Sequence, residues 1–120
     1  MAFLKSLILF TLFSSSCLAV TLEEMSVDEK VGQLLMVHFH GSEVNEEAKA
    51  LIADVKVGGI IYYPFSNGLH SKQEVRRLSC DLQSLASIPL LIASDEEGGV
   101  VSRVQGLTQF PGNGALGSTL

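Results

Sequence analysis

The stretch Ile88-Pro-Leu-Leu-Ile-Ala-Ser-Asp-Glu-Glu-Gly-Gly99 decides the fold, because a short apolar run ends there in an acidic, glycine-rich turn. Residues 90–93 predict a strand, since they form a β-prone run introduced by Pro89. A second run of this kind, residues 60–63, follows Gly58-Gly59. Continuous apolar runs are typical of parallel strands buried on both faces. The pattern therefore predicts a parallel sheet.

Helical patterns separate the predicted strands. Ser26 and Glu29 form a capping box, and Asn45 and Ser71 are the expected caps of a second and a third helix. The apolar residues expected on the buried faces of these helices are Val31, Leu34 and Leu35; Val44, Ala48, Leu51, Ile52 and Val55; and Val75, Leu78, Leu82 and Leu85. Their spacing is that of amphipathic helices.

Strands and helices alternate along the chain. A first strand is expected over residues 36–39, ending before Gly41, so that three strands and three helices follow one another. Residues 64–68 and 110–120 are expected to be loops, because they are rich in proline, glycine and asparagine. Short alternating elements indicate βαβ units with right-handed crossovers. The predicted fold class is α/β.

Composition bounds the function. The chain has 120 residues, and its 8 Lys+Arg against 13 Asp+Glu give a net charge of −5. One domain is expected at this length, and the acidic balance and the lack of a basic cluster beyond Arg76-Arg77 argue against nucleic-acid binding. Of the 2 cysteines, Cys80 has no evident intramolecular partner, so a disulfide framework is not expected.

Residues 1–19 predict a secretory signal peptide. A short head with Lys5 is followed by the apolar run 6–13 and by the small residues 14–19. The run is too short for the ~20 residues of a spanning helix. Cleavage after Ala19 would leave residues 20–120, secreted or periplasmic. Lipidation at Cys17 is the alternative, although Ser14 stands where a lipoprotein signal usually has Leu.

The acidic turn is the densest chemical signal. It lies at the carboxyl end of a predicted parallel strand, the edge where α/β folds build their sites. A glycosidase needs two carboxyl groups on either side of the bond that it cleaves. Asp95 and Glu96 point to opposite sides of an extended chain, and the side chains of Asp95 and Glu97 would run parallel. Neither pair can therefore act as the acid and the nucleophile by itself. The turn is better suited to binding polar groups, with Arg103 as a returning donor. A plain solvated loop is the alternative.

Other residues give weaker signals. His38 and His40 leave a strand on one side and would hold a metal only with a third ligand such as Asp95; hydrogen-bonded or exposed histidines are the alternative. His70 follows a turn and is expected to face solvent. Tyr62-Tyr63 could stack on a sugar, but alternation places one ring inward and the other outward.

Four blocks in order carry a resemblance. They are Ser26-x-Asp-Glu-Lys-Val-Gly-Gln-Leu-Leu-Met-Val37, Val57-Gly-Gly-Ile-Ile61, Ile88-Pro-Leu-Leu-Ile-Ala93 with Asp95-Glu-Glu-Gly-Gly99, and Phe110-Pro with Ala115-Leu-Gly117. The sequence from about Leu22 to Gly117 resembles glycoside hydrolase family 3, and more narrowly the bacterial beta-N-acetylglucosaminidase branch. The Asp-Glu-Glu-Gly-Gly form separates it from the beta-glucosidase branch.

The resemblance implies a (β/α)8 TIM barrel, of which residues 20–120 would form an incomplete part with the first roughly three βα units. It implies retaining removal of terminal N-acetylglucosamine from peptidoglycan or chitin fragments, with no cofactor and no metal. Asp95 matches the family's substrate-binding aspartate and Arg103 the second arginine of its Gly-Gly-Arg-Val-x-Arg pattern. Val100 replaces the first arginine, and His38 stands where Gly is usual.

In the family, the nucleophilic Asp and the general-acid His loop come later in the chain. No catalytic residue is therefore predicted here, and the expected function is a binding part that is inactive alone, with a possible partner chain completing the barrel. A standalone secreted sugar-binding or interaction module is the alternative. A metallohydrolase using His38 and His40 is a third hypothesis.

Overall fold

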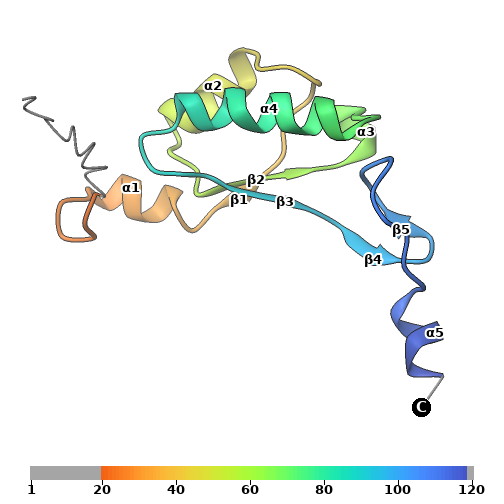
Figure 1. The fold of residues 1–120 in the computed structure, drawn as a ribbon. Coiled ribbons are helices and arrows are strands. Elements are labelled where there is room, and N and C mark those ends of the chain that lie inside the picture. Colours follow the sequence, from red (N-terminus) through yellow and green to blue (C-terminus); the bar gives the residue numbers. More distant parts are fainter. Residues whose placement is uncertain (1–19, 119–120) are drawn as a thin grey trace, which may run out of the picture.

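A three-stranded parallel sheet forms the centre of the protein (Figure 1). The computed structural model describes residues 20–118, so the predicted signal peptide and Cys17 lie outside the described residues. The strands are β1 (Met36–Val37), β2 (Gly59–Tyr62) and β3 (Leu91–Ser94), in the order β1-β2-β3. All pairs are parallel, which confirms the predicted βαβ arrangement.

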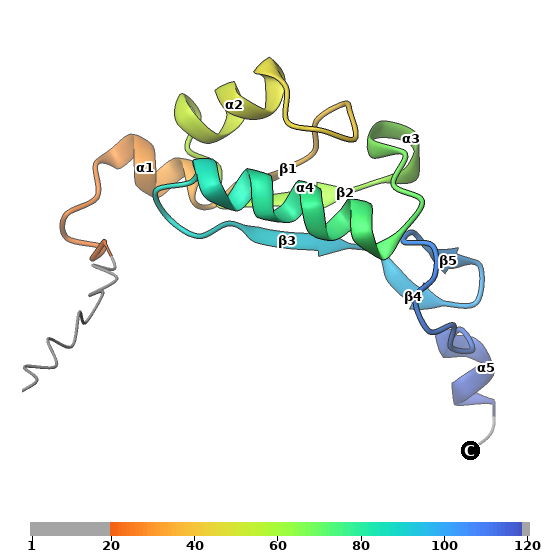
Figure 2. The same cartoon turned by 45° about the horizontal axis from the view of Figure 1, so that its top comes forward.

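Two helices, α2 (Glu46–Ala53) and α4 (Lys72–Leu85), cover one face of the sheet (Figures 1 and 2). The buried core lies between this face and the helices and consists of Phe39, Ala48, Ile52, Val57, Ile60, Tyr62, Leu69, Leu78, Leu82 and Leu90. The predicted apolar stripes of these two helices supply much of it. Within residues 20–118, every helix is too short or too polar to cross a membrane.

The three predicted helix caps are confirmed. Ser26 Oγ accepts a hydrogen bond from the backbone N–H of Glu29 at the start of α1 (Val27–Gly32), and the Ser26 N–H donates back to the Glu29 carboxylate. The side chains of Asn45 and Ser71 likewise accept from the backbone N–H groups of Ala48 and Glu74 at the starts of α2 and α4. Each cap satisfies a backbone donor that would otherwise lack a partner in the first turn.

The predicted stripe of the first helix is wrong. α1 ends at Gly32, so Leu34 and Leu35 lie beyond it, and both are exposed, as is Val31. A side chain on Gly32 would bring its Cβ within 2.2 Å of the Val55 carbonyl oxygen. α1 therefore meets the loop after α2 through backbone, not through an apolar face.

Two predicted loops contain short helices. Residues 64–67 form α3 (Pro64–Asn67), with Pro64 in the first turn and Gly68 ending it at φ +59°. Proline is preorganised for a helix start and glycine for a left-handed helix end, so the same residues that suggested a loop bracket one helical turn. The C-terminal segment contains α5 (Asn113–Gly117). The predicted first strand is also shorter than expected, since β1 ends at Val37.

The expectation that strands are buried on both faces holds for one face alone. Ile60 and Tyr62 point to the helices and are buried, whereas Leu91 is 67% exposed and Met36 46% exposed on the opposite face. Alternation along a strand explains the split. No described element covers this second face within residues 20–118, and we call it the open face (Figures 1 and 2).

The acidic turn is a hairpin. β4 (Glu96–Gly98) pairs antiparallel with β5 (Val101–Ser102), and residues 96–118, called here the arm, extend beyond the sheet (Figure 1). Gly98 has φ +78°, and a Cβ there would lie 2.6 Å from the Pro111 carbonyl oxygen. Glycine is thus required by both backbone conformation and space.

Candidate functional site

Asp95 lies directly after β3 at the carboxyl end of the sheet. Alternation from Leu91 through Ala93 places its side chain on the open face, away from α2 and α4. The carboxylate oxygen Oδ2 is 3.5 Å from Arg103 Nε, and about a third of each side chain is exposed. The sequence prediction that these two residues come together is confirmed.

Glu96 positions Arg103, a role that the sequence reasoning did not find. Its carboxylate accepts hydrogen bonds from the hydroxyls of Ser94 and Ser102 and from the backbone N–H groups of Arg103 and Val104, at 2.7–3.1 Å. Partial burial acts to raise the pKa of Glu96, but these hydrogen bonds, with Ser102 the largest contributor, lower it overall. Glu96 is thus committed to holding the hairpin and the chain after it.

Four rings gather beside this pair, and we call His38, His40, Tyr63 and Phe65 the aromatic cluster. Tyr63 and Phe65 stack with centroids 5.1 Å apart at 17°. His38 meets the rings of Tyr63, Phe65 and His40 edge-on at 5.7, 5.8 and 5.4 Å. Tyr62, by contrast, is buried, and its hydroxyl shares a 3.0 Å hydrogen bond with Ser79. The predicted alternation of the two tyrosines is confirmed.

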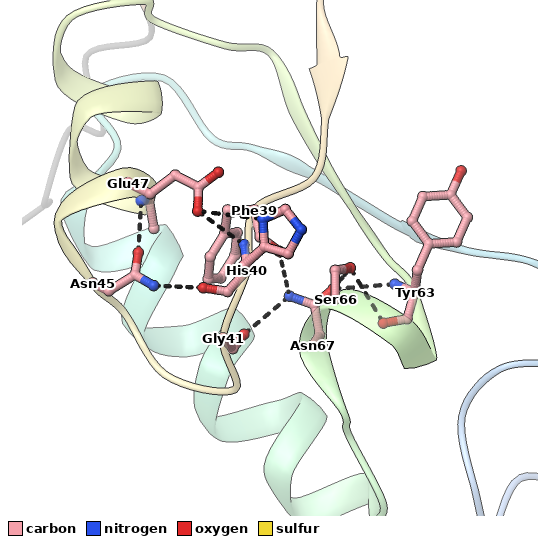
Figure 3. Close-up of polar contacts among 9 residues, drawn as sticks. Phe39, His40, Gly41, Asn45, Glu47, Tyr63, Ser66 and Asn67 are labelled. Atoms are coloured by element: carbon pink, nitrogen blue, oxygen red, sulfur yellow. Dashed lines mark hydrogen bonds and ion pairs between the residues drawn. The ribbon is translucent and has the colours of Figure 1, made fainter.

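Asn67 ties the loops after β1 and β2 together (Figure 3). Its side-chain nitrogen donates to the carbonyl oxygens of Phe39 and Gly41 at 3.2 and 3.0 Å. Its side-chain oxygen accepts from the Tyr63 N–H and the Ser66 hydroxyl at 3.1 and 3.0 Å. Asn67 is 3% exposed, and its bonds to Phe39 and Ser66 are buried while those to Gly41 and Tyr63 are partly buried. The sequence reasoning took this asparagine as a loop marker only.

The third hypothesis, a metal site on His38 and His40, is not supported by the side-chain positions. His40 pairs with Glu47 at 3.6 Å, and Asp95, the suggested third ligand, pairs with Arg103. Within residues 20–118, no group of three His, Cys, Asp or Glu residues is placed to hold a metal ion. His70 is exposed, as predicted.

Two nitrogen atoms at this edge are shielded from solvent without a hydrogen bond. Within the described part of the chain they are His38 Nδ1 and Arg103 Nε, the latter facing Asp95 across the ion-pair distance. Buried polar atoms usually have a hydrogen-bond partner, so two exceptions at one edge of the sheet single this edge out. Both belong to the candidate site.

A groove of about 540 Å³ runs along the arm instead of over this pair. Its lining residues are Glu96, Glu97, Gly98, Ser102, Leu107, Thr108, Gln109, Phe110, Pro111, Asn113 and Leu116. Neither Asp95 nor Arg103 lines it. The Asp95–Arg103 pair is therefore separate from this groove.

The sequence that forms this fold and site matches a known family. A sequence profile described as "Glycosyl hydrolase family 3 N terminal domain" matches residues 26–120. This chain belongs to glycoside hydrolase family 3. The matched span includes all three strands and the Asp95–Arg103 pair. The family assigned by resemblance is thus confirmed.

Solved family 3 structures share the fold. A glycoside hydrolase family 3 beta-N-acetylglucosaminidase from Paenibacillus sp. is 44% identical with a TM-score of 0.71, over 78% of this chain and 18% of that one. NagZ from Neisseria gonorrhoeae, solved with N-trifluoroacetyl-D-glucosamine, is 29% identical with a TM-score of 0.62, over 70% and 25%. These neighbours are TIM-barrel enzymes, so the three parallel strands with α2 and α4 form part of that barrel fold.

Curated relatives are longer than this chain. A beta-hexosaminidase of Photobacterium profundum is 41% identical over 78 residues, which are 64% of this chain and 23% of the relative. One of Alkalilimnicola ehrlichii is 37% identical over 83 residues, 68% of this chain and 23% of the relative. The chain spans about a quarter of the length of the curated relatives that it matches.

Proposed function

We propose that this chain forms the sugar-binding part of a retaining beta-N-acetylglucosaminidase and binds the terminal N-acetylglucosamine of peptidoglycan or chitin fragments. The Asp95–Arg103 pair at the carboxyl end of β3 carries the proposal. A carboxylate has acceptor positions for two neighbouring sugar hydroxyls, and the ion pair with the Arg103 guanidinium orients it. The relatives' activity supports the choice of sugar.

Hydrolysis needs groups beyond residues 20–118 in this proposal. A retaining displacement requires a nucleophile and an acid about 5–5.5 Å apart. Asp95 is paired with Arg103, and the Glu96 carboxylate is occupied by four hydrogen bonds. Glu97 lines the groove of the arm, away from the pair. The chain alone is therefore expected to bind sugar without cleaving it.

The open face favours an enzyme part over a standalone module. Leu91 and Met36 expose apolar surface there that a barrel would enclose. We infer that further βα units, in a longer chain or in a separate partner chain, cover this face. Light scattering after size exclusion, together with a thermal unfolding curve, distinguishes the enzyme part from the standalone module. A monomer that unfolds cooperatively would favour the standalone module.

Calorimetric titration with N-acetylglucosamine tests the binding proposal. Asp95→Asn is expected to weaken binding at least ~10-fold, because it removes the charge paired with Arg103. Glu97→Gln, the same change two residues away, is the matched control and should leave binding unchanged. A well-folded chain that releases no heat would overturn the proposal, and turnover of a chromogenic N-acetylglucosaminide would overturn the expected inactivity.

Export is a proposal of its own. We infer from residues 1–19 that the chain is secreted or periplasmic, with cleavage after Ala19. Amino-terminal sequencing of the exported product in a bacterial host tests this cleavage. Lipidation at Cys17 would instead give a membrane-bound product that Cys17→Ala releases. A product retained with residues 1–19 in the cytoplasm would contradict both.

A further inference from the structure

The chain contains two Asn-Gly pairs that lie in opposite settings. Asn67-Gly68 ends α3, and Asn113-Gly114 begins α5. In such a pair the backbone nitrogen of the glycine can attack the amide carbon of the asparagine side chain, because glycine has no Cβ to hinder the approach. The pairs themselves are identical, so the surrounding structure decides which of them reacts.

The structure blocks this attack at Asn67 (Figure 3). The side chain is 3% exposed, its nitrogen donates to two carbonyl oxygens, and its oxygen accepts from an N–H and a hydroxyl. The Gly68 N–H, which carries the attacking nitrogen, donates to the Pro64 carbonyl oxygen at 3.1 Å. The attack therefore requires α3 to open and these hydrogen bonds to break.

Asn113 lacks these constraints. Its side chain is exposed and takes part in no hydrogen bond within residues 20–118. Gly114 is also exposed and lies in the first turn of α5, where backbone N–H groups have no partner within the helix. α5 has five residues and no side-chain cap, so it opens more easily than a longer helix (Figure 1).

We propose that Asn113 is a site of spontaneous deamidation, a reaction from which the fold protects Asn67. The Gly114 nitrogen bonds to Asn113 Cγ, the Cγ–Nδ2 bond breaks, and the proton of the Gly114 N–H leaves with Nδ2 as ammonia. Water then opens the cyclic imide at either of its two carbonyl carbons. The products are aspartate and isoaspartate, in which the main chain runs through the former side chain. The net reaction consumes one water, releases one ammonia and needs no oxidant or cofactor.

The reaction changes the arm. Asn113 lines the groove of the arm, so either product adds a negative charge beside Glu96 and Glu97. Aspartate in the first turn favours α5, because the amino end of a helix attracts negative charge. Isoaspartate lengthens the backbone by one atom and disturbs the regular helical spacing. The two products therefore have opposite effects on α5.

Incubation of the full 120-residue chain, followed by peptide mass spectrometry, compares the two asparagines. Asn113 is expected to deamidate at least ~10-fold faster than Asn67, because Asn67 reacts only through an opened state. In concentrated urea, which unfolds both α3 and α5, the two rates should become similar. The rate at Asn113 should also rise with pH, since the attacking nitrogen must lose its proton.

Two glycines of α5 provide matched variants. A Cβ on Gly114 or on Gly117 would meet nothing within 4 Å, so alanine fits at both positions. Gly114→Ala should slow deamidation of Asn113 at least ~10-fold, because it hinders the attacking nitrogen and also stabilises the helix. Gly117→Ala stabilises the same helix away from that nitrogen and should slow the reaction at most ~5-fold, the factor given by the difference in helix propensity.

Three results would overturn the proposal. The first is equal deamidation of Asn67 and Asn113 without urea, and the second is an Asn113 that reacts only in urea. The third is equal slowing by Gly114→Ala and Gly117→Ala, or aspartate formed without isoaspartate, because either would exclude attack by the Gly114 nitrogen. None of these measurements involves sugar binding, so their outcomes are independent of the proposed function.

Discussion

The sheet with α2 and α4 and the arm of residues 96–118 are held by different forces. In the first region Ile60, Leu78 and Leu82 are fully buried or nearly so. In the arm, Val104 is the one buried hydrophobic residue among those described, and hydrogen bonds to Glu96 and from Gly99 to the Phe110 carbonyl order the chain. Stability therefore resides mainly in the sheet, whereas the arm determines where Arg103 lies.

The largest expected difference is between two leucines. Leu82→Ala in α4 should lower the free energy of unfolding by about 2–5 kcal/mol, because it leaves a cavity in a closed core. Leu107→Ala in the arm, where the side chain is 37% exposed, should lower it by less than ~1 kcal/mol. Urea denaturation followed by circular dichroism measures both. Equal decreases in the free energy of unfolding would mean that the arm contributes to stability as much as the core does.

The next largest effect is expected for Asn67→Ala, which should lower the free energy of unfolding by about 2–3 kcal/mol. The change removes the bonds to the carbonyl oxygens of Phe39 and Gly41 and from the Tyr63 N–H. The Phe39 bond is buried and the other two are partly buried, and polar groups left unsatisfied away from water are costly. Asn113→Ala, at an exposed position in α5, should change stability by under ~0.5 kcal/mol. The same denaturation experiment compares them. A small effect of Asn67→Ala would mean that water replaces the lost bonds.

Glu96→Gln should act locally. Global stability is expected to change little, but amide hydrogen exchange of Arg103 and Val104 should speed up, because a neutral acceptor holds their N–H groups less strongly. Glu97→Gln is the control. Because folding lowers the pKa of Glu96, its contribution is present above the ordinary carboxyl range and is lost as pH falls through the lowered value. Unchanged exchange at pH 7 would contradict this role.

The smallest effect concerns α1, which resembles the arm in depending on polar contacts. Hydrogen bonds from the backbone and hydroxyl of Ser26 and from Lys56 lower the pKa of Glu29 from 4.5 to about 2. The stabilisation is therefore complete above pH 4.5 and is lost as pH falls toward 2. In an NMR titration, Ser26→Ala should raise this pKa only partway, because the backbone N–H remains. A wild-type value near 4.5 would contradict the capping box.

Local patterns explain how much of the fold could be predicted. Ser26, Asn45 and Ser71 cap helices through side chains that bond three residues ahead, so the information lies within one turn. The apolar runs around Ile60 and Ile92 predicted strands that pair in parallel. The expected loop at residues 64–68 failed because proline and glycine also start and end a single helical turn.

The sequence by itself determined the alternating strands and helices, the family and the acidic turn after the third strand, because periodicity, caps and ordered motifs are carried by neighbouring residues. The sequence also placed Asp95 and Arg103 together through the family resemblance, but only the tertiary structure decided that Glu96 is committed to the hairpin. It also decided that Asn67 joins two loops and that Phe65 stays exposed beside Tyr63. These contacts join residues up to 28 positions apart in the sequence, as in the bond from Asn67 to Phe39. Sheet register and the path of the loops bring such residues together, and a local sequence pattern does not encode either.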